Sequence, residues 1–281
     1  MNSVAAVIIL YNPDKSIIAN LESCRKQVDK LFVVDNSEGL EETRIKIETG
    51  PDIEIFSHNE NLGVATALNI AAKQALKDEF DYLLTLDQDT LIPEDLVSKL
   101  LFTIQSDKMA AIAAPFYSNI NYDLKPLQKD LSLPLVVPTS ANLLNLIAFR
   151  EVGNFNDNLF IDYVDFDFCM RLKLMGYKIL QNNSIVVKHS VGNLVKDNFL
   201  GFKFYTTNHP PLRLYYRTRN RFYLRKTYKS YFPDFFRKDL VNLLKQLVKM
   251  ILVEKNKFQK LKMIVLGYRH YKTGQLGKLN S

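Results

Sequence analysis

The sequence predicts an α/β fold in which an open, mostly parallel, Rossmann-like sheet is flanked by helices and followed by a basic helical C-terminal extension. The chain has 281 residues and is 47% hydrophobic, enough to bury a sizeable core. Short apolar runs that end in polar residues alternate with helix-like stretches, as in parallel strands joined by crossover helices. The charge is uneven, because residues 198–281 carry 19 Lys and Arg against 3 Asp and Glu.

The first half of the chain supplies most of the predicted parallel strands. Residues 4–10 (VAAVIIL) form a continuous apolar run that stops at Tyr11, as a strand buried on both faces does. Further strands are predicted at 31–34, 53–56, 82–86 and 110–115, with helices over about 15–27, 40–48 and 63–77. Ligands of such sheets bind at the carboxyl ends of the strands, where this sequence places Tyr11, Asp35, Asn59 to Asn61 and Asp87 to Asp89.

The second half is less regular. Residues 117–135 are rich in loop signals and give no clear secondary structure. A helix is predicted near 162–175, closed by Gly176, and strand-like pieces follow at 177–181 and 185–189.

Asp87-Gln88-Asp89 follows directly on the strand at 82–86. Two carboxylates at positions i and i+2 of a turn can direct oxygen ligands at one hard cation such as Mg²⁺ or Mn²⁺, which in turn can neutralise a diphosphate. The alternative is an acidic turn that caps the helix beginning near Pro93. The tripeptide alone does not decide between the two.

Three aspartates, Asp162, Asp165 and Asp167, alternate with aromatic residues at the start of the predicted helix. Apolar neighbours can raise the pKa of a carboxylate toward that of a general base, so one of the three could deprotonate a hydroxyl. The alternative for each is that it stabilises the positive helix N-terminus and pairs with Arg171.

His189 ends the apolar segment that begins at Ile185. A neutral imidazole can complete a metal site that already holds a carboxylate, although a lone histidine is more often structural. With four histidines in the chain, a multi-histidine zinc site is not expected.

Two cysteines, Cys24 and Cys169, are too few for a disulfide framework and favour a reducing compartment. The N-terminal residues show no basic leader followed by a long apolar segment. A cytoplasmic location is therefore expected.

Taken in order, these motifs resemble those of the family-two inverting glycosyltransferases with the GT-A fold, and within them the bacterial rhamnosyltransferases that use dTDP-rhamnose. The resemblance covers roughly residues 4–225. Its motifs are Val33 to Ser37, Asn59 to Gly63 with Asn69, Leu84 to Asp89, Leu159 to Asp167, Arg171, Gly176-Tyr177, His189, and Tyr215 to Asn220.

The resemblance implies a nucleotide site at the strand ends. Asp35 would hydrogen-bond the pyrimidine base, with Tyr11 and the turn from Asn61 to Gly63 lining the pocket. Asp87 would face the ribose and the donor sugar. The domain from 1–230 would divide into a nucleotide-sugar half, about 1–115, and an acceptor half, about 116–230, with 231–281 as the basic extension.

The resemblance also implies the catalytic groups. Asp89 and His189 would ligate the Mg²⁺ or Mn²⁺ that bridges the donor phosphates, and Asp165 would be the general base. Many relatives carry an arginine where this chain has Leu68, so Arg219 is a candidate for the phosphate contact.

Two departures affect the acceptor side: Val164 stands where relatives often have glutamate before the base, and Ser140-Ala141-Asn142 stands where many have a serine-glycine segment.

The implied reaction is inverting transfer of rhamnose from dTDP-rhamnose onto a lipid-linked or growing cell-surface polysaccharide, such as capsule or O-antigen. One alternative is transfer of GlcNAc, Gal or Glc from a UDP-sugar, and another is a non-catalytic nucleotide-sugar or membrane-binding scaffold. A nucleotidyltransferase would be expected to have a glycine-rich basic loop after the first strand, and Tyr11-Asn12-Pro13-Asp14 is not such a loop.

Residues 236–265 combine apolar positions spaced by three and four with interspersed lysines. This pattern is typical of a helix lying on an anionic membrane surface, and equally of an amphipathic helix packed on its own domain. The family's lipid-linked acceptors favour peripheral association with the inner face of the cell membrane. No nucleic-acid-binding module is recognisable.

Overall fold

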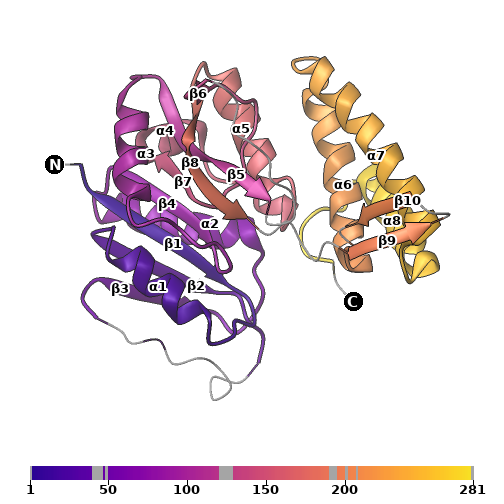
Figure 1. The fold of residues 1–281 in the computed structure, drawn as a ribbon, viewed down its shortest axis with the longest axis horizontal. Coiled ribbons are helices and arrows are strands. Elements are labelled where there is room, and N and C mark those ends of the chain that lie inside the picture. Colours follow the sequence, from indigo (N-terminus) through magenta and orange to yellow (C-terminus); the bar gives the residue numbers. More distant parts are fainter. Residues whose placement is uncertain are drawn as a thin grey trace. The chain divides into compact units, whose positions relative to one another are not determined.

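The computed structural model describes residues 2–39, 47, 50–119, 129–189, 195–199, 202–206 and 208–279, with backbone alone at 119, 189, 195–199 and 202–206. The predicted helix at 40–48, apart from residue 47, and residues 120–128 of the predicted loop-rich stretch at 117–135 lie outside the described residues. The chain forms two compact units (Figure 1). We call Met1–Phe160 with Val164–His189 the N-terminal unit, and Ile161–Tyr163 with Ser190–Ser281 the C-terminal unit.

The N-terminal unit is built on one sheet with the strand order β3-β2-β1-β4-β7-β5-β8-β6. Its first four strands, all mutually parallel, are β1 (Val4–Leu10), β2 (Lys30–Asp35), β3 (Ile53–Ser57) and β4 (Tyr82–Asp87). The α/β fold and these predicted strands are confirmed.

The rest of the sheet is mixed. β5 (Ala110–Asn119) runs parallel to β8 (Lys178–His189), whereas β6 (Leu131–Ser132) is antiparallel to β8. β7 (Asn142–Asn145) is antiparallel to both β4 and β5 and lies between them. The two predicted strand pieces at 177–181 and 185–189 are one strand with a register shift.

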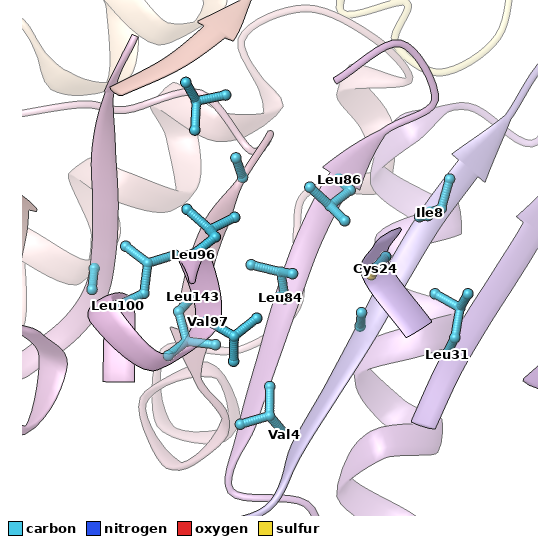
Figure 2. Close-up of a cluster of buried hydrophobic side chains, with 14 of the residues drawn as sticks. Val4, Ile8, Cys24, Leu31, Leu84, Leu86, Leu96, Val97, Leu100 and Leu143 are labelled. Carbon is cyan, nitrogen blue, oxygen red and sulfur yellow. The ribbon is translucent and has the colours of Figure 1, made fainter. Parts of the chain in front are cut away.

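Helices cover the sheet. α1 (Ile17–Arg25) and α3 (Leu96–Gln105) share one core cluster with β1, β2, β4 and β7, in which Leu84, Leu100 and Leu143 are fully buried (Figure 2). α2 (Val64–Lys77) contacts β1, β2 and β4 with an alanine-rich face outside that cluster. α4 (Leu146–Val152), the 3-10 helix η2 (Asp157–Leu159) and α5 (Val164–Leu174) complete the unit.

The described residues of the C-terminal unit form a hairpin and three helices. The hairpin pairs β9 (Val195–Phe199) with β10 (Phe202–Thr206), and the helices are α6 (Pro211–Tyr228), α7 (Pro233–Val253) and α8 (Lys257–Thr273). α6 packs closely on α8, since a Cβ at Gly267 would lie 2.5 Å from the carbonyl oxygen of Tyr215. This packing groups α6 with the extension, and the two compact units divide near residue 190.

The predicted amphipathic stretch at 236–265 is two helices, α7 and α8, because Glu254 is extended and Asn256 has a left-handed φ of 55°. None of the helices in the described ranges is long and apolar enough to cross a membrane.

Candidate active site

Acidic and aromatic residues meet at the carboxyl edge of the parallel strands. β1 lies between β2 and β4, with Leu10 in register with Asp35 and Ile9 in register with Asp87. Tyr11 follows β1 directly and leaves 48% of its surface exposed. The structure therefore brings together, at one edge of the sheet, three residues that the sequence placed in a nucleotide site.

Gln88, between the two aspartates, ties the end of β1 to the turn after β4. Its Oε1 accepts from the Tyr11 N–H at 2.8 Å, and its Nε2 donates to the Tyr11 carbonyl at 3.3 Å. Asn20 Nδ2 donates to the Gln88 carbonyl oxygen at 2.8 Å. Gln88 thus holds the residue after β1 against the turn after β4. This gives a structural role to the middle residue of the Asp87-Gln88-Asp89 motif, for which the sequence alone indicated none.

The Asp35 carboxylate is buried and ordered by the backbone that follows it. Its Oδ1 accepts from the Ser37 N–H at 2.8 Å, and Ser37 Oγ accepts from the Asn12 N–H at 2.8 Å. Asn36 Nδ2 donates to the Gly63 carbonyl at 3.1 Å, while Asn36 Oδ1 is buried with no partner among the described protein groups. These bonds join the end of β2 to the turn before α2.

That turn requires a glycine. Asn61 Oδ1 accepts from the Gly63 N–H at 2.9 Å, and Gly63 has a φ of 84°. A Cβ there would lie 2.5 Å from Phe160 Cδ2 and 2.6 Å from the Phe160 carbonyl oxygen, which itself accepts from the Val64 N–H at 2.7 Å. Left-handed backbone and close approach both exclude a side chain at Gly63.

Ser140 anchors the turn that carries the two aspartates. Its buried hydroxyl accepts from the Asp87 N–H at 3.2 Å and lies 2.6 Å from Thr90 Oγ1. Asp89, between these contacts, is exposed. The backbone of the turn is therefore fixed while the Asp89 side chain faces solvent.

The segment after Asp89 reaches the end of β8. Leu91 forms an antiparallel bridge with Lys188, the neighbour of His189. Asp89 thus lies two residues before one partner of this bridge, and His189 directly follows the other partner. The described residues contain no group of three or more His, Cys, Asp and Glu that could by itself hold a metal ion.

The three aspartates near α5 have separate environments. Asp167 is buried and pairs with Arg171 at 2.9 Å, so the structural alternative holds for Asp167. Asp162 belongs to the C-terminal unit, where Arg213 lies 3.2 Å from it. Asp165 is partly exposed in the first turn of α5, where its Oδ1 accepts from the Phe166 N–H.

Asp165 and Asp87 lie in the neighbourhood of one phenol. Burial raises the pKa of Tyr117 well above its usual range, and electrostatic interactions with Cys169, Asp87 and Asp165 raise it further. Tyr117 comes from β5, which the sequence analysis did not connect with the site. A half-buried tyrosine that interacts electrostatically with two acids could not be foreseen without the strand pairing.

Arg219 needs a correction. It is fully buried in the C-terminal unit and donates to the Gly277 carbonyl at 2.6 Å and to Asn220 Oδ1 at 3.0 Å. Its guanidinium also lies over the rings of Tyr215 and Tyr216. Because no part of Arg219 reaches the surface, we assign it a structural role and not the predicted phosphate contact.

Solved structures share this fold. GalNAc-T7 with UDP, GalNAc and Mn²⁺ matches with a TM-score of 0.60 and 13% identity, over 84% of this chain and 49% of that chain. S. aureus TarS 1–349 in complex with UDP-GlcNAc matches with a TM-score of 0.54 and 14% identity, over 96% of this chain and 73% of that one. The chain thus spans about half the length of the first of these structures. The likeness shows a GT-A fold.

Beyond the fold, the sequence shows the family to which the chain belongs. The model of glycosyl transferase family 2 matches residues 5–181, so the chain belongs to that family and is a glycosyltransferase. The match covers nearly all of the N-terminal unit. The chain is also similar to the dTDP-rhamnosyl transferase RfbF of Shigella flexneri, with 27% identity over 288 residues and 95% of each chain covered.

Proposed function

We propose that the chain is an inverting rhamnosyltransferase that moves rhamnose from dTDP-rhamnose onto a lipid-linked or growing cell-surface polysaccharide. The observation that carries the donor is the similarity to RfbF across 95% of both chains, which extends beyond the family match into the C-terminal unit. A UDP-sugar donor is the competing proposal, because the TarS structure of similar fold was solved with UDP-GlcNAc.

The donor would lie across the carboxyl edge of β2, β1 and β4. Asp35 accepts hydrogen bonds from the base, and the exposed ring of Tyr11 lines the pocket together with the turn from Asn61 to Gly63. Asp87 faces the ribose and the sugar. The fixed backbone supports these roles, since Gln88 and Ser140 hold the ends of β1 and β4 through hydrogen bonds to the backbone of Tyr11 and Asp87.

A divalent cation fits the remaining groups. Asp89 offers an exposed carboxylate, a ligand suited to Mg²⁺ or Mn²⁺, and His189 lies next to the bridge that joins the two segments. Asp89 and His189 would be the two protein ligands, and diphosphate and water oxygens would complete the coordination of the cation. When bound, the cation would supply charge neutralisation to the departing diphosphate.

Asp165 would take the proton from the acceptor hydroxyl while that oxygen attacks the anomeric carbon and the diphosphate leaves on the opposite side. One displacement inverts the configuration. Asp165 suits this role better than its neighbours because Asp167 is buried against Arg171 and Asp162 is paired with Arg213. With Val164 where relatives often have glutamate, Asp165 is the partly exposed acid in the first turn of α5, whereas Asp167 is buried.

Calorimetry tests the donor. The full chain is titrated with dTDP-rhamnose, UDP-GlcNAc and UDP-Gal, each with and without Mn²⁺. We expect binding that is selective for dTDP-rhamnose and stronger with the metal. Preference for a UDP-sugar would replace the rhamnosyl proposal, and absence of binding to all three would support a scaffold.

Peripheral membrane association rests on α7. Its outer face carries an exposed apolar row of Leu240, Val241, Leu244, Val248, Ile251 and Leu252, with exposed Lys238 and Lys245 on the same helix. An apolar row next to lysines suits an anionic lipid surface.

Sedimentation with phosphatidylglycerol vesicles tests this contact. Leu244→Glu should reduce binding, whereas Phe102→Glu, at a 79% exposed position on α3, is the matched control. Equal binding of wild type and Leu244→Glu would remove the membrane from the proposal and leave the transfer reaction untouched.

A further inference from the structure

The C-terminal unit contains a partly open cavity of about 200 Å³ between α6, α7 and α8. Each helix contributes an apolar wall residue, of which Leu214, Leu247 and Ile264 are examples. The cavity belongs wholly to this unit and contains none of the residues assigned to the donor or the acceptor. It is therefore a second candidate binding site.

Cationic side chains line the same cavity, and they differ in whether a carboxylate neutralises their charge. Arg221 is buried and pairs with Asp239 at 3.0 Å. Arg217 is partly buried, and its Nη1 lies 2.7 Å from His209 Nε2. In the part of the chain that the structure describes, no carboxylate lies within ion-pair distance of Arg217, and Glu254 at the cavity wall is engaged by Lys260 at 2.6 Å.

The pKa of His209 is consistent with positive charge around this cavity. Burial lowers its pKa to about 3, with further lowering by the charges of Arg217, Arg213 and Lys260. The imidazole is thus neutral at physiological pH and accepts the Arg217 N–H through Nε2. A neutral partner does not offset the guanidinium charge, so the cavity keeps an excess of positive charge over apolar walls.

We propose that this cavity binds a phosphate group carried on an apolar chain. The planar guanidinium of Arg217 presents paired N–H donors that match phosphate oxygens. The walls from Leu214, Leu247 and Ile264 would cover the first carbons of the chain. A membrane phospholipid and free phosphate share the anionic group, and the apolar walls favour the lipid.

Calorimetry on the full chain without sugar donor tests the site independently of transfer. The probes are dihexanoyl phosphatidic acid below its micelle concentration, dihexanoyl phosphatidylcholine and inorganic phosphate. We expect the phosphatidic acid to bind at least tenfold more tightly than the other two. Inorganic phosphate binding as tightly as the lipid would overturn the apolar part, and equal binding of phosphatidylcholine would overturn the anionic part.

Variants locate the binding. Arg217→Gln should weaken the phosphatidic acid at least tenfold, whereas Arg237→Gln, at an exposed position on α7 outside the cavity, should bind as the wild type does. Leu247→Ser tests the walls and should weaken the lipid more than it weakens phosphate. If Arg217→Gln fails to fold, Arg217→Lys and Leu247→Ser carry the test, and unchanged lipid affinity in both would overturn the proposal.

Discussion

The two units differ in the charged groups that they bury. The N-terminal unit buries the acids Asp35 and Asp167, whereas the C-terminal unit buries the cations Arg219, Arg221 and Lys260. Asp35 stands at a strand end beside the candidate donor site, but Arg219 and Lys260 serve internal contacts. Part of the positive charge of the C-terminal region is therefore buried in its interior. A count of charges in the sequence overstates the positive charge that the surface offers to a ligand.

The largest effect should come from removing the proposed base of the N-terminal unit. Asp165→Asn cannot accept a proton, so we expect transfer of labelled sugar to an acceptor preparation to fall by about 10²–10⁴-fold. Calorimetry should show unchanged donor affinity.

Asp162→Asn sharpens that result, because Asp162 pairs with Arg213 in the C-terminal unit and has no proposed proton to accept. Equal loss of transfer in the two variants would contradict the assignment of the base.

The next effect concerns stability in the C-terminal unit. Arg219→Met keeps an apolar stem but leaves the Gly277 carbonyl and Asn220 Oδ1 without this donor. We expect the free energy of unfolding to fall by about 2–4 kcal/mol, measured by denaturant titration, with donor affinity unchanged. The exposed Arg237→Met is the control. Normal stability with weakened donor binding would restore the phosphate contact to Arg219.

A smaller effect is expected at Asp89, the proposed metal ligand. Asp89→Asn loses a carboxylate charge, so the gain in donor affinity on adding Mn²⁺ should shrink by about tenfold, or about 1.4 kcal/mol. Asp95→Asn changes an exposed acid just before α3 and should keep the gain. An Asp89→Asn variant with the wild-type Mn²⁺ response would exclude this residue as a ligand.

The smallest effect is a pH dependence in the C-terminal unit. Because the pKa of His209 is about 3 in the folded chain and about 6.5 when unfolded, the unfolded state binds the extra proton between these values. The contribution of His209 to the free energy of unfolding is fully present above pH 6.5 and declines as the pH falls toward 3. Between pH 7.5 and 5.5 the wild-type Tm should drop a few degrees more than that of His209→Gln.

The exposed His58→Gln serves as the control and should follow the wild type. Identical pH profiles for wild type and His209→Gln would show that His209 is not the group responsible.

The parallel half of the sheet was predictable because its strands are continuous apolar runs. The run at 4–10 and the strand at 82–86 are β1 and β4 within one residue at each end. Their polar ends placed Tyr11, Asp35 and Asp87 at one edge, since parallel neighbours finish together. The sequence was therefore sufficient to predict that these residues lie together at one edge of the sheet.

The remaining features depend on contacts between distant segments. β7 is four residues long and has no alternating pattern that would mark an edge or a pairing partner. The sequence suggested Arg219 as a phosphate ligand because no local pattern shows that this side chain is buried. Its burial results from packing against Tyr215, Tyr216 and Gly277. The helix break at Asn256 likewise depends on a left-handed residue within an unbroken amphipathic pattern.

The position of β7 imposes an order on folding. In the described sheet it joins the β3-β2-β1-β4 half to the β5-β8-β6 half, although it follows β5 in the chain. During synthesis the first half can assemble as soon as β4 emerges, and β5 must wait until residues 142–145 are available as a spacer. A nascent chain halted before β7 exposes an unpaired edge of β4, the kind of surface on which misassembly and chaperone binding begin.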